Sequence, residues 1–145
     1  MSGDGSLEFD FSSVVANMAT ATARVKLAAK NGVQDSVDDL KRIAVDIAPI
    51  DSGDLRRSGH ATVRENAASI VGEVSFSAVD DSSGRRFNYA IKMHEGEYNL
   101  GPLSAAAPGT DGYEVGNKYL ERPLKGEANK YMRWIAEEIE DAVGD

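Results

Sequence analysis

The stretch PIDSGDLRRSG, residues 49–59, separates a long segment of helical periodicity from a segment in which apolar and polar residues alternate. Pro49 pushes the residue before it out of the helical conformation, so the chain must leave its helix here. Asp, Ser and Arg lie close together in this stretch, and His60 follows it. These residue types would suit either a catalytic cluster or a corner of the fold.

A fold corner accounts for more of these residues than a catalytic cluster does. Gly53 permits a tight backbone, and Leu55 can fill the core. The guanidinium of Arg56 or Arg57 can reach a carboxylate or a backbone carbonyl. We therefore interpret residues 49–59 as a structural corner.

A serine hydrolase is the catalytic alternative, with Ser52 as nucleophile, His60 as base and Asp54 as the group that orients the base. Such a serine usually stands on a sharp turn from strand to helix, as in G-x-S-x-G. Ser52 instead follows a helix and lies between Asp51 and Gly53. Asp51 or Ser52 more simply caps a short helical turn. We expect no catalytic residue in this chain.

Before the corner, apolar residues and alanines recur at steps of three and four over residues 9–48, which predicts a helix. At 1.5 Å per residue this helix would be about 60 Å long, whereas a globule of this size is about 40 Å across. We expect either an end that projects or a break at Asn31–Gly32, since glycine costs about 1 kcal/mol inside a helix. After a break, Asp35 or Ser36 could cap a second helix. The apolar positions are Phe11, Val15, Met18, Ala21, Val25, Ala29, Val33, Val37, Leu40, Ala44 and Ile47.

The pattern of residues predicts strands in three stretches after the corner. Residues 61–64 form a short candidate strand. Residues 69–78 alternate between apolar side chains and Ser or Glu, and residues 87–93 alternate again, with residues 80–86 as a loop between them. Such alternation is typical of a sheet that is covered on one face only.

The last third of the chain combines a loop with a helix. Residues 96–118 are rich in glycine and poor in large apolar groups, so little can offset the entropy of ordering them, and we expect a mobile loop. Residues 120–143 carry an amphipathic stripe, with Pro123 in the first turn. We therefore predict one domain, residues 1–145, of the α+β class. An antiparallel sheet of three to four strands would be covered by a long N-terminal helix, intact or broken near Gly32, and by a C-terminal helix.

The composition excludes several kinds of site and partner. The chain has no cysteine, which removes disulfides and thiolate chemistry and fits a reducing compartment. Its net charge of −8 disfavours binding to a phosphate backbone. We find no apolar run of about 18 residues and no basic, apolar leader, so we expect a soluble protein without a membrane span.

No motif predicts a metal or cofactor site. MHEGE, residues 93–97, lacks the second histidine of H-E-x-x-H, and His60 is the one other histidine. EEIED, residues 137–141, is typical of a solvated helix face. GPLSAAAPGTDG, residues 101–112, is neither a dinucleotide-binding nor a P-loop pattern. We expect no bound metal and no cofactor.

Three separated pieces resemble the minor capsid proteins of HK97-type tailed bacteriophages, which act in the neck or in tail completion. PIDSGDLRRSG resembles the corner P-x-[DT]-[ST]-G-x-L-R-x-S of that group. YAIKMHEGE, residues 89–97, resembles its Y-A-x-x-x-H-E-G segment. KYLERPL, residues 118–124, resembles its closing [KF]-[YF]-L-x-[RK]-[PA]-L. Order and spacing also agree over about residues 40–140.

The resemblance implies an α+β virion protein that forms a homo-oligomeric ring, six copies or a multiple, at the head–tail junction. The partners would be the head connector and the tail tube or terminator. DNA would pass through an acidic lumen without specific binding, and assembly would occur in the host cytoplasm. The linker between the second and third pieces is longer than in a minimal member, which leaves open which neck ring is formed. The implied structural or interface residues are Gly53, Leu55, Arg56, Ser58, Tyr89, His94, Glu95, Gly96, Tyr119, Leu120, Arg122 and Pro123.

The alternative function is an acidic cytosolic protein-binding module, an adaptor or inhibitor on the same kind of scaffold. It predicts a stable monomer that captures a defined partner, whereas the ring protein predicts self-assembly. The hydrolase alternative predicts an activity that Ser52→Ala abolishes without loss of the fold.

Overall fold

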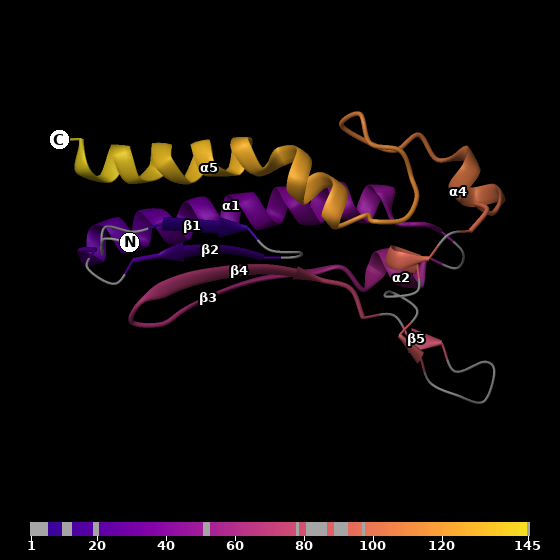
Figure 1. Ribbon diagram of the computed structural model, residues 1–145, viewed down its shortest axis with the longest axis horizontal. Coiled ribbons are helices and arrows are strands. Elements are labelled where there is room, and N and C mark those ends of the chain that lie inside the picture. Colours follow the sequence, from indigo (N-terminus) through magenta and orange to yellow (C-terminus); the bar gives the residue numbers. More distant parts are fainter. Residues whose placement is uncertain are drawn as a thin grey trace.

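The computed structural model describes residues 6–9, 13–18, 21–50, 53–77, 79–80, 87–88, 93–96 and 98–144. Its elements form helices stacked on a small antiparallel sheet, which confirms the predicted α+β class (Figure 1). In chain order they are β1 (Ser6–Phe9), β2 (Ser13–Asn17), α1 (Ala23–Ile47), α2 (Asp54–Arg57), β3 (His60–Glu65), β4 (Ser69–Ser75), β5 (Val79–Asp80), β6 (Phe87–Asn88), α4 (Pro102–Ala106) and α5 (Glu121–Val143).

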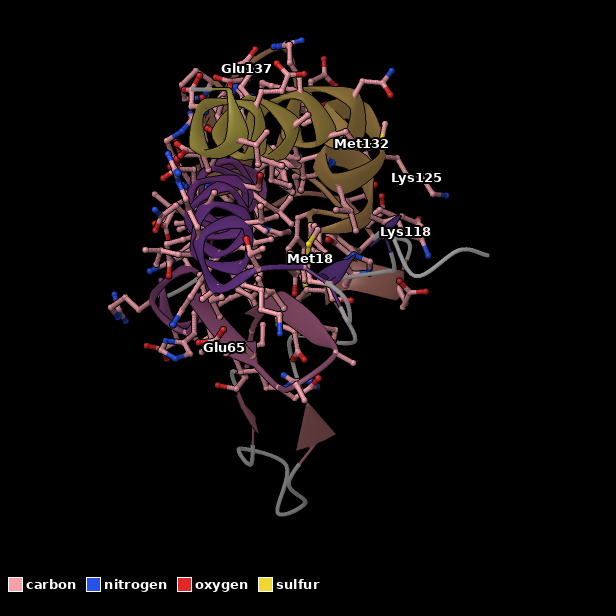
Figure 2. All side chains as sticks on the ribbon, turned by 90° about the vertical axis from the view of Figure 1, so that its left-hand side faces the viewer. Met18, Glu65, Lys118, Lys125, Met132 and Glu137 are labelled. Carbon is pink, nitrogen blue, oxygen red and sulfur yellow. The ribbon has the colours of Figure 1, made fainter. Side chains whose placement is uncertain are left out.

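Helix α1 is the middle layer of the molecule. Viewed along the helices, α5 lies over α1 and α1 lies over the sheet (Figure 2). The sheet has the order β1-β2-β4-β3, and each neighbouring pair is antiparallel. Because α1 packs on both sides, it has ten buried residues, among them Val33, Val37, Leu40 and Ile43.

The predicted helix over residues 9–48 is wrong before Ala23, where the chain forms β1 and β2. Val14, Ala16 and Met18 are buried at alternate positions, which is the period of a strand. The helix begins after Thr22, whose side chain accepts a hydrogen bond from the backbone N–H of Val25 at 3.3 Å. An N-cap of this kind satisfies one of the donors at the start of a helix.

The break at Asn31–Gly32, one of the two expected alternatives, is also absent. Helix α1 runs unbroken over 25 residues, or about 37 Å, which fits the domain without a projecting end. Gly32 is buried against α5, and a Cβ at this position would lie 2.7 Å from the Cα of Ile135. Ser36 does not cap a second helix, because its hydroxyl donates to the carbonyl of Gly32 at 2.8 Å. The glycine therefore serves the packing of two helices and does not end one.

Two of the strand predictions are confirmed and the third is correct only in part. Strands β3 and β4 cover most of residues 61–64 and 69–78 and pair with each other. Strand β6 has two residues and pairs with β5 in a separate small sheet, while residues 93–95 form a helical turn. The carbonyl of Met93 accepts a hydrogen bond from the Tyr98 hydroxyl, and that of His94 accepts one from the Lys118 N–H, so neither joins a strand ladder. Residues 81–86 and 89–92 lie outside the described residues.

The C-terminal helix is confirmed as α5. Its buried side chains are Pro123, Leu124, Tyr131 and Ile135, and the last three belong to the hydrophobic core that also contains the buried side chains of α1. No helix in the described part of the chain combines the length and apolar character needed to cross a membrane.

The close approach at Gly32 gives a first prediction. Gly32→Ala should lower the free energy of unfolding by about 1–3 kcal/mol, because the new methyl group overlaps the backbone of Ile135 and one helix must move. This cost should exceed the gain in helix propensity of about 1 kcal/mol. Urea unfolding followed by circular dichroism measures the change.

Gly101→Ala is the matched control, because a Cβ there would have no heavy atom within 4 Å. A Gly32→Ala protein as stable as the wild type, or more stable, would contradict the close contact.

Candidate functional site

The site residues implied by the resemblance come together at one end of the molecule, where α1 ends, α2 follows and α5 begins (Figure 1). We call this region the junction. It joins the corner, the turn at residues 93–96 and the approach to α5. Tyr89 lies outside the described residues. The junction residues are Gly53, Leu55, Arg56, Ser58, His94, Glu95, Gly96, Tyr119, Leu120, Arg122 and Pro123.

Arg56 holds the end of α1 against the corner. The last carbonyls of a helix have no partner within that helix. The Arg56 guanidinium donates from Nε to the carbonyl of Ala48 and from Nη2 to that of Asp46, both at 2.8 Å. Burial lowers the pKa of Arg56, against a smaller opposing effect of Asp46. The guanidinium therefore acts as a cap for α1.

The other corner residues also make contacts within the chain. Gly53 has φ of +88°, a left-handed conformation in which a side chain would be strained. Leu55 is buried in the core. The Ser58 hydroxyl donates to the carbonyl of Leu55 at 2.7 Å and accepts from the N–H of Ser77 at 3.1 Å. Ser58 thus ties the corner to the end of β4. The proposed caps Asp51 and Ser52 lie outside the described residues.

His94 links the second motif to the third. Its ring is 3% exposed. Nε2 accepts a hydrogen bond from the backbone N–H of Glu121 at 3.3 Å, so Nδ1 carries the proton and donates to the carboxylate of Glu95. The Glu121 N–H is one of the donors at the start of α5 that lack a helical partner. Burial lowers the pKa of His94, although Glu95 opposes this shift. A neutral histidine therefore caps α5.

Lys118 also links the second motif to the third, through its backbone and its side chain. Its N–H donates to the carbonyl of His94 at 2.7 Å, and its ammonium lies 2.7 Å from the Glu95 carboxylate. Lys118, and then His94, hold the pKa of Glu95 below its ordinary value. The side-chain amide of Asn117 donates to the carbonyl of Gly96 at 3.0 Å. Residues 94–96 are thus fixed against residues 117–118 by main-chain and side-chain contacts together.

Tyr119 is the apolar centre of the junction. Its ring is 1% exposed. It contacts Phe76 and His94 edge to face, with centroids 4.9 Å and 5.0 Å away. Such pairs add about 0.5–1.5 kcal/mol to the effect of burial. Leu120 and Pro123 are also buried. The ring therefore packs the end of β4 against the second motif.

Arg122, in the third motif, donates hydrogen bonds to two backbone carbonyls, as Arg56 does in the first motif. Its Nε donates to the carbonyl of Asn117 at 2.8 Å and its Nη2 to that of Glu114 at 2.9 Å. Burial lowers the pKa of Arg122. This guanidinium holds the turn that leads into α5.

The segment expected to be a loop, residues 96–118, has more anchors than its composition suggested. It contains α4 and a turn closed by a bridge between Thr110 and Tyr113. The Ser104 hydroxyl is buried, accepts from the Ile50 N–H at 2.7 Å and donates to the Ile50 carbonyl at 3.1 Å. The N–H of Gly116 donates to the carbonyl of Ile47 at 3.0 Å. These contacts include hydrogen bonds that its composition did not indicate, and the mobility of the segment stays a prediction.

A polar network between α1 and α5 was not predicted from the sequence. The Asp39 carboxylate accepts from Lys130, Arg42 and the Tyr131 hydroxyl, each at 2.9 Å. Burial raises the pKa of Asp39, but these three hydrogen bonds together lower it below its ordinary value. Arg42 also reaches Asp111 at 2.7 Å, which connects residues 96–118 to α1.

An acidic groove opens beside this network. It encloses about 560 Å³ between α1 and α5 and has Trp134 in its wall. Six of its eight lining residues are carboxylates, so its surface potential is negative. The lining residues are Asp35, Asp38, Asp39, Arg42, Trp134, Glu137, Glu138 and Asp141.

The part of the chain that the structure describes contains His60 and no candidate metal site. No group of three or more His, Asp or Glu side chains there is placed to hold a metal ion. His60 is exposed at the start of β3. Ser52, the nucleophile of the hydrolase hypothesis, lies outside the described residues.

Comparisons of the chain with protein-family models, with curated proteins and with solved structures give no match. The resemblance to phage minor capsid proteins therefore depends on the three motifs alone. What it implies about assembly and partners stays a prediction.

Replacing Arg56 by alanine should reduce the stability of the protein much more than replacing Arg57. Arg56→Ala should lower the free energy of unfolding by about 1–3 kcal/mol, because two carbonyls at the end of α1 lose their donor. Arg57→Ala removes an exposed ion pair with Asp54 and should cost less than about 1 kcal/mol. Urea unfolding of both variants measures the difference, and equal losses would contradict the capping role of Arg56.

Stability should fall as the pH drops from 7.5 to 5.5. Because the pKa of His94 is lowered in the folded state, the unfolded chain takes up this proton first, at pH values near the ordinary 6.5. Protonation would also set an Nε2–H against the Glu121 N–H. Glu95, Lys118 and Glu121 are the charged groups around this ring. The midpoint of urea unfolding at each pH measures the effect.

The variants His94→Gln and His60→Asn show which of the two histidines causes the loss of stability at low pH. The loss of stability between pH 7.5 and 5.5 should be smaller in His94→Gln. It should be unchanged in His60→Asn, because the wild-type side chain is exposed. A decline that disappears only with His60→Asn would contradict the role given to His94.

Proposed function

We propose that this protein is a structural virion protein of a tailed bacteriophage that forms a ring of identical subunits at the head–tail junction. The observation that carries this proposal is the junction itself. The three motifs of the resemblance are separated by about 30 and 20 residues in sequence. The second and third contact each other directly, through two hydrogen bonds of His94, to the Glu121 and Lys118 N–H groups, and through the rings of His94 and Tyr119. The first is linked to them through β4, because Ser58 bonds the N–H of Ser77 and the neighbouring Phe76 ring contacts Tyr119. Motifs that resemble those of one family and are also connected in space are better support than three independent matches.

The chemistry of the junction supports a structural role. Arg56, Arg122 and Ser58 donate to backbone carbonyls of the same chain. His94 accepts from a backbone N–H with the nitrogen that a general base would need. Side chains committed to the backbone in this way fix the shape of a subunit. A subunit of fixed shape is what a closed ring requires.

The charge of the chain supports a DNA passage through the ring. A net charge of −8 repels phosphate, so an acidic lumen would let a genome slide without adhering to the wall. The proposed partners are the head connector on one side and the tail tube or terminator on the other. Assembly would take place in the host cytoplasm and end in the virion.

An acidic protein-binding module is the second candidate, and the groove between α1 and α5 favours it. Its carboxylates and Trp134 would suit a basic segment of another protein. A module of this kind would work as a monomer.

The mass of the purified protein separates the two candidates. The ring protein should form particles of six copies or a multiple, visible as annuli by negative-stain electron microscopy and sized by light scattering. The binding module should keep the mass of one chain, 15.5 kDa, at every concentration. A persistent monomer would contradict the ring proposal, and genes for portal, capsid and tape-measure proteins beside this one would support it.

A further inference from the structure

The first turn of α5 depends on a side chain from outside the helix. The residue before α5 provides no side-chain cap. The N–H of Arg122 donates to the carbonyl of Lys118, and Pro123 has no N–H. The N–H of Glu121 donates to Nε2 of His94. One buried imidazole therefore completes the hydrogen bonds of the N–H groups of these three helix residues.

A proton on Nε2 of His94 would break this arrangement. An imidazolium donates from both nitrogens, so Nε2 could no longer accept from the Glu121 N–H. The ring is 3% exposed, and it lies at the positive end of the α5 dipole. The charged ring would thus be held inside the protein against an N–H group and a positive helix end. Movement of His94 away from α5 removes both conflicts.

Three charged groups face the ring from the described residues around it. Glu95 lies in the same turn as His94, and its carboxylate accepts from Nδ1. Lys118, which Figure 2 labels, precedes α5, and Glu121 is the first residue of that helix. Glu95 and Glu121 favour the charged ring, whereas burial and Lys118 favour the neutral one. Burial is the largest of these effects, and it lowers the pKa of His94 below the ordinary 6.5.

The turn before α5 is strained, and contacts with the same region hold it. Lys118 has φ of +54°, a left-handed conformation that is unfavourable for a residue with a side chain. Its N–H donates to the carbonyl of His94 at 2.7 Å, and its ammonium pairs with Glu95. When His94 moves away from α5, these contacts loosen and the backbone of Lys118 can relax. The strain therefore favours opening once the ring is charged.

The contacts that hold the rest of the fold lie elsewhere. Tyr131 of α5 donates to the carboxylate of Asp39 of α1, and Ile135 is fully buried between the two helices. The buried Ser104 hydroxyl makes two hydrogen bonds to the backbone of Ile50. Opening at His94 breaks none of these contacts. It can therefore be confined to the first turn of α5 and the turn at residues 93–96.

We propose that residues 94–96 and 117–121 form a latch that opens when His94 takes up a proton, while the long helices and the sheet remain folded. The closed latch is favoured above pH 6.5, and the open latch gains as the pH falls below this value, because the freed histidine binds a proton more tightly. This inference does not depend on self-assembly, since every group in the latch belongs to one chain.

Hydrogen exchange at single amides, measured by NMR, tests the latch. The reporters are the N–H groups of Lys118 and Glu121, both bonded to His94. Between pH 7.5 and 5.5 the opening constant should rise by about tenfold, the gain in proton binding of a freed histidine with a pKa of 6.5 over a closed ring that stays neutral. The protection factor, which corrects for the direct effect of pH on exchange, should fall accordingly. A protection factor that does not change with pH would overturn the proposal.

Low concentrations of urea separate local opening from unfolding of the whole protein. Exchange through the latch should be almost independent of urea, because a local opening exposes little surface. The amides of Val37 and Leu40, in the buried part of α1, should be better protected and strongly dependent on urea. If the amides of Lys118 and Glu121 share the protection and the urea dependence of these α1 amides, the latch opens only by global unfolding and the proposal is wrong.

His94→Gln is the informative variant, and His60→Asn is its matched control. Glutamine keeps an oxygen that can accept from the Glu121 N–H, but it takes up no proton in this pH range. The change in protection with pH should largely disappear in His94→Gln and persist in His60→Asn, whose wild-type side chain is exposed.

The ring resonances of the wild type provide a second measurement that needs no variant. Those of His94 should titrate with a midpoint below 6.5, because the closed latch holds the ring neutral. A midpoint above 6.5, or a pH effect that persists in a folded His94→Gln protein, would contradict the role of His94 in the latch.

Discussion

The architecture depends on how closely helix α1 approaches its two neighbours, and one glycine on each side permits that approach. Gly32 on α1 faces the backbone of Ile135 in α5. Gly72 on β4 faces α1, where a Cβ would lie 2.6 Å from methyl groups of both Val33 and Val37. Valine has little rotamer freedom in a helix, so these side chains could not easily give way. The separation of the three layers is therefore fixed by the absence of two side chains.

The sequence predicted the fold class and most elements, and its errors have specific causes. Residues 13–18 were assigned to the helix because steps of three and four through Val15, Met18 and Ala21 fit a helical stripe. The alternation of Val14, Ala16 and Met18 fits a strand equally well, and only the pairing of β2 with β4 decides between them. Thr22, followed by an apolar residue three positions later, was the available sign of the helix start. A break at Gly32 was one of two alternatives, because helix propensity describes an isolated helix and takes no account of a neighbouring helix that needs the space.

The candidate site was predictable where it is local and was missed where it depends on distant contacts. The corner and the approach to α5 each lie within a dozen residues, and their motifs could be recognised. Ser104 contacts Ile50 across 54 positions, and Asp39 contacts Tyr131 across 92. A serine before an alanine run gives no sign of such a partner. The one available signal for the network was the pair of opposite charges three residues apart at Asp39 and Arg42, which is common on exposed helices.

The anchors of residues 96–118 bear on the proposed assembly. In the proposed ring, an unanchored loop would have to become ordered when subunits meet, and its loss of conformational entropy would weaken the contact that it makes. In this chain Arg42 holds Asp111, Glu127 holds the Tyr113 hydroxyl at 2.8 Å, and Arg122 holds the carbonyl of Glu114. Burial, together with the bond to Glu127, raises the pKa of Tyr113 to about 12, so this phenol stays a donor at any physiological pH. Helices α1 and α5 therefore do more than form two layers of the fold, because their polar side chains hold in place the segment from which α4 projects.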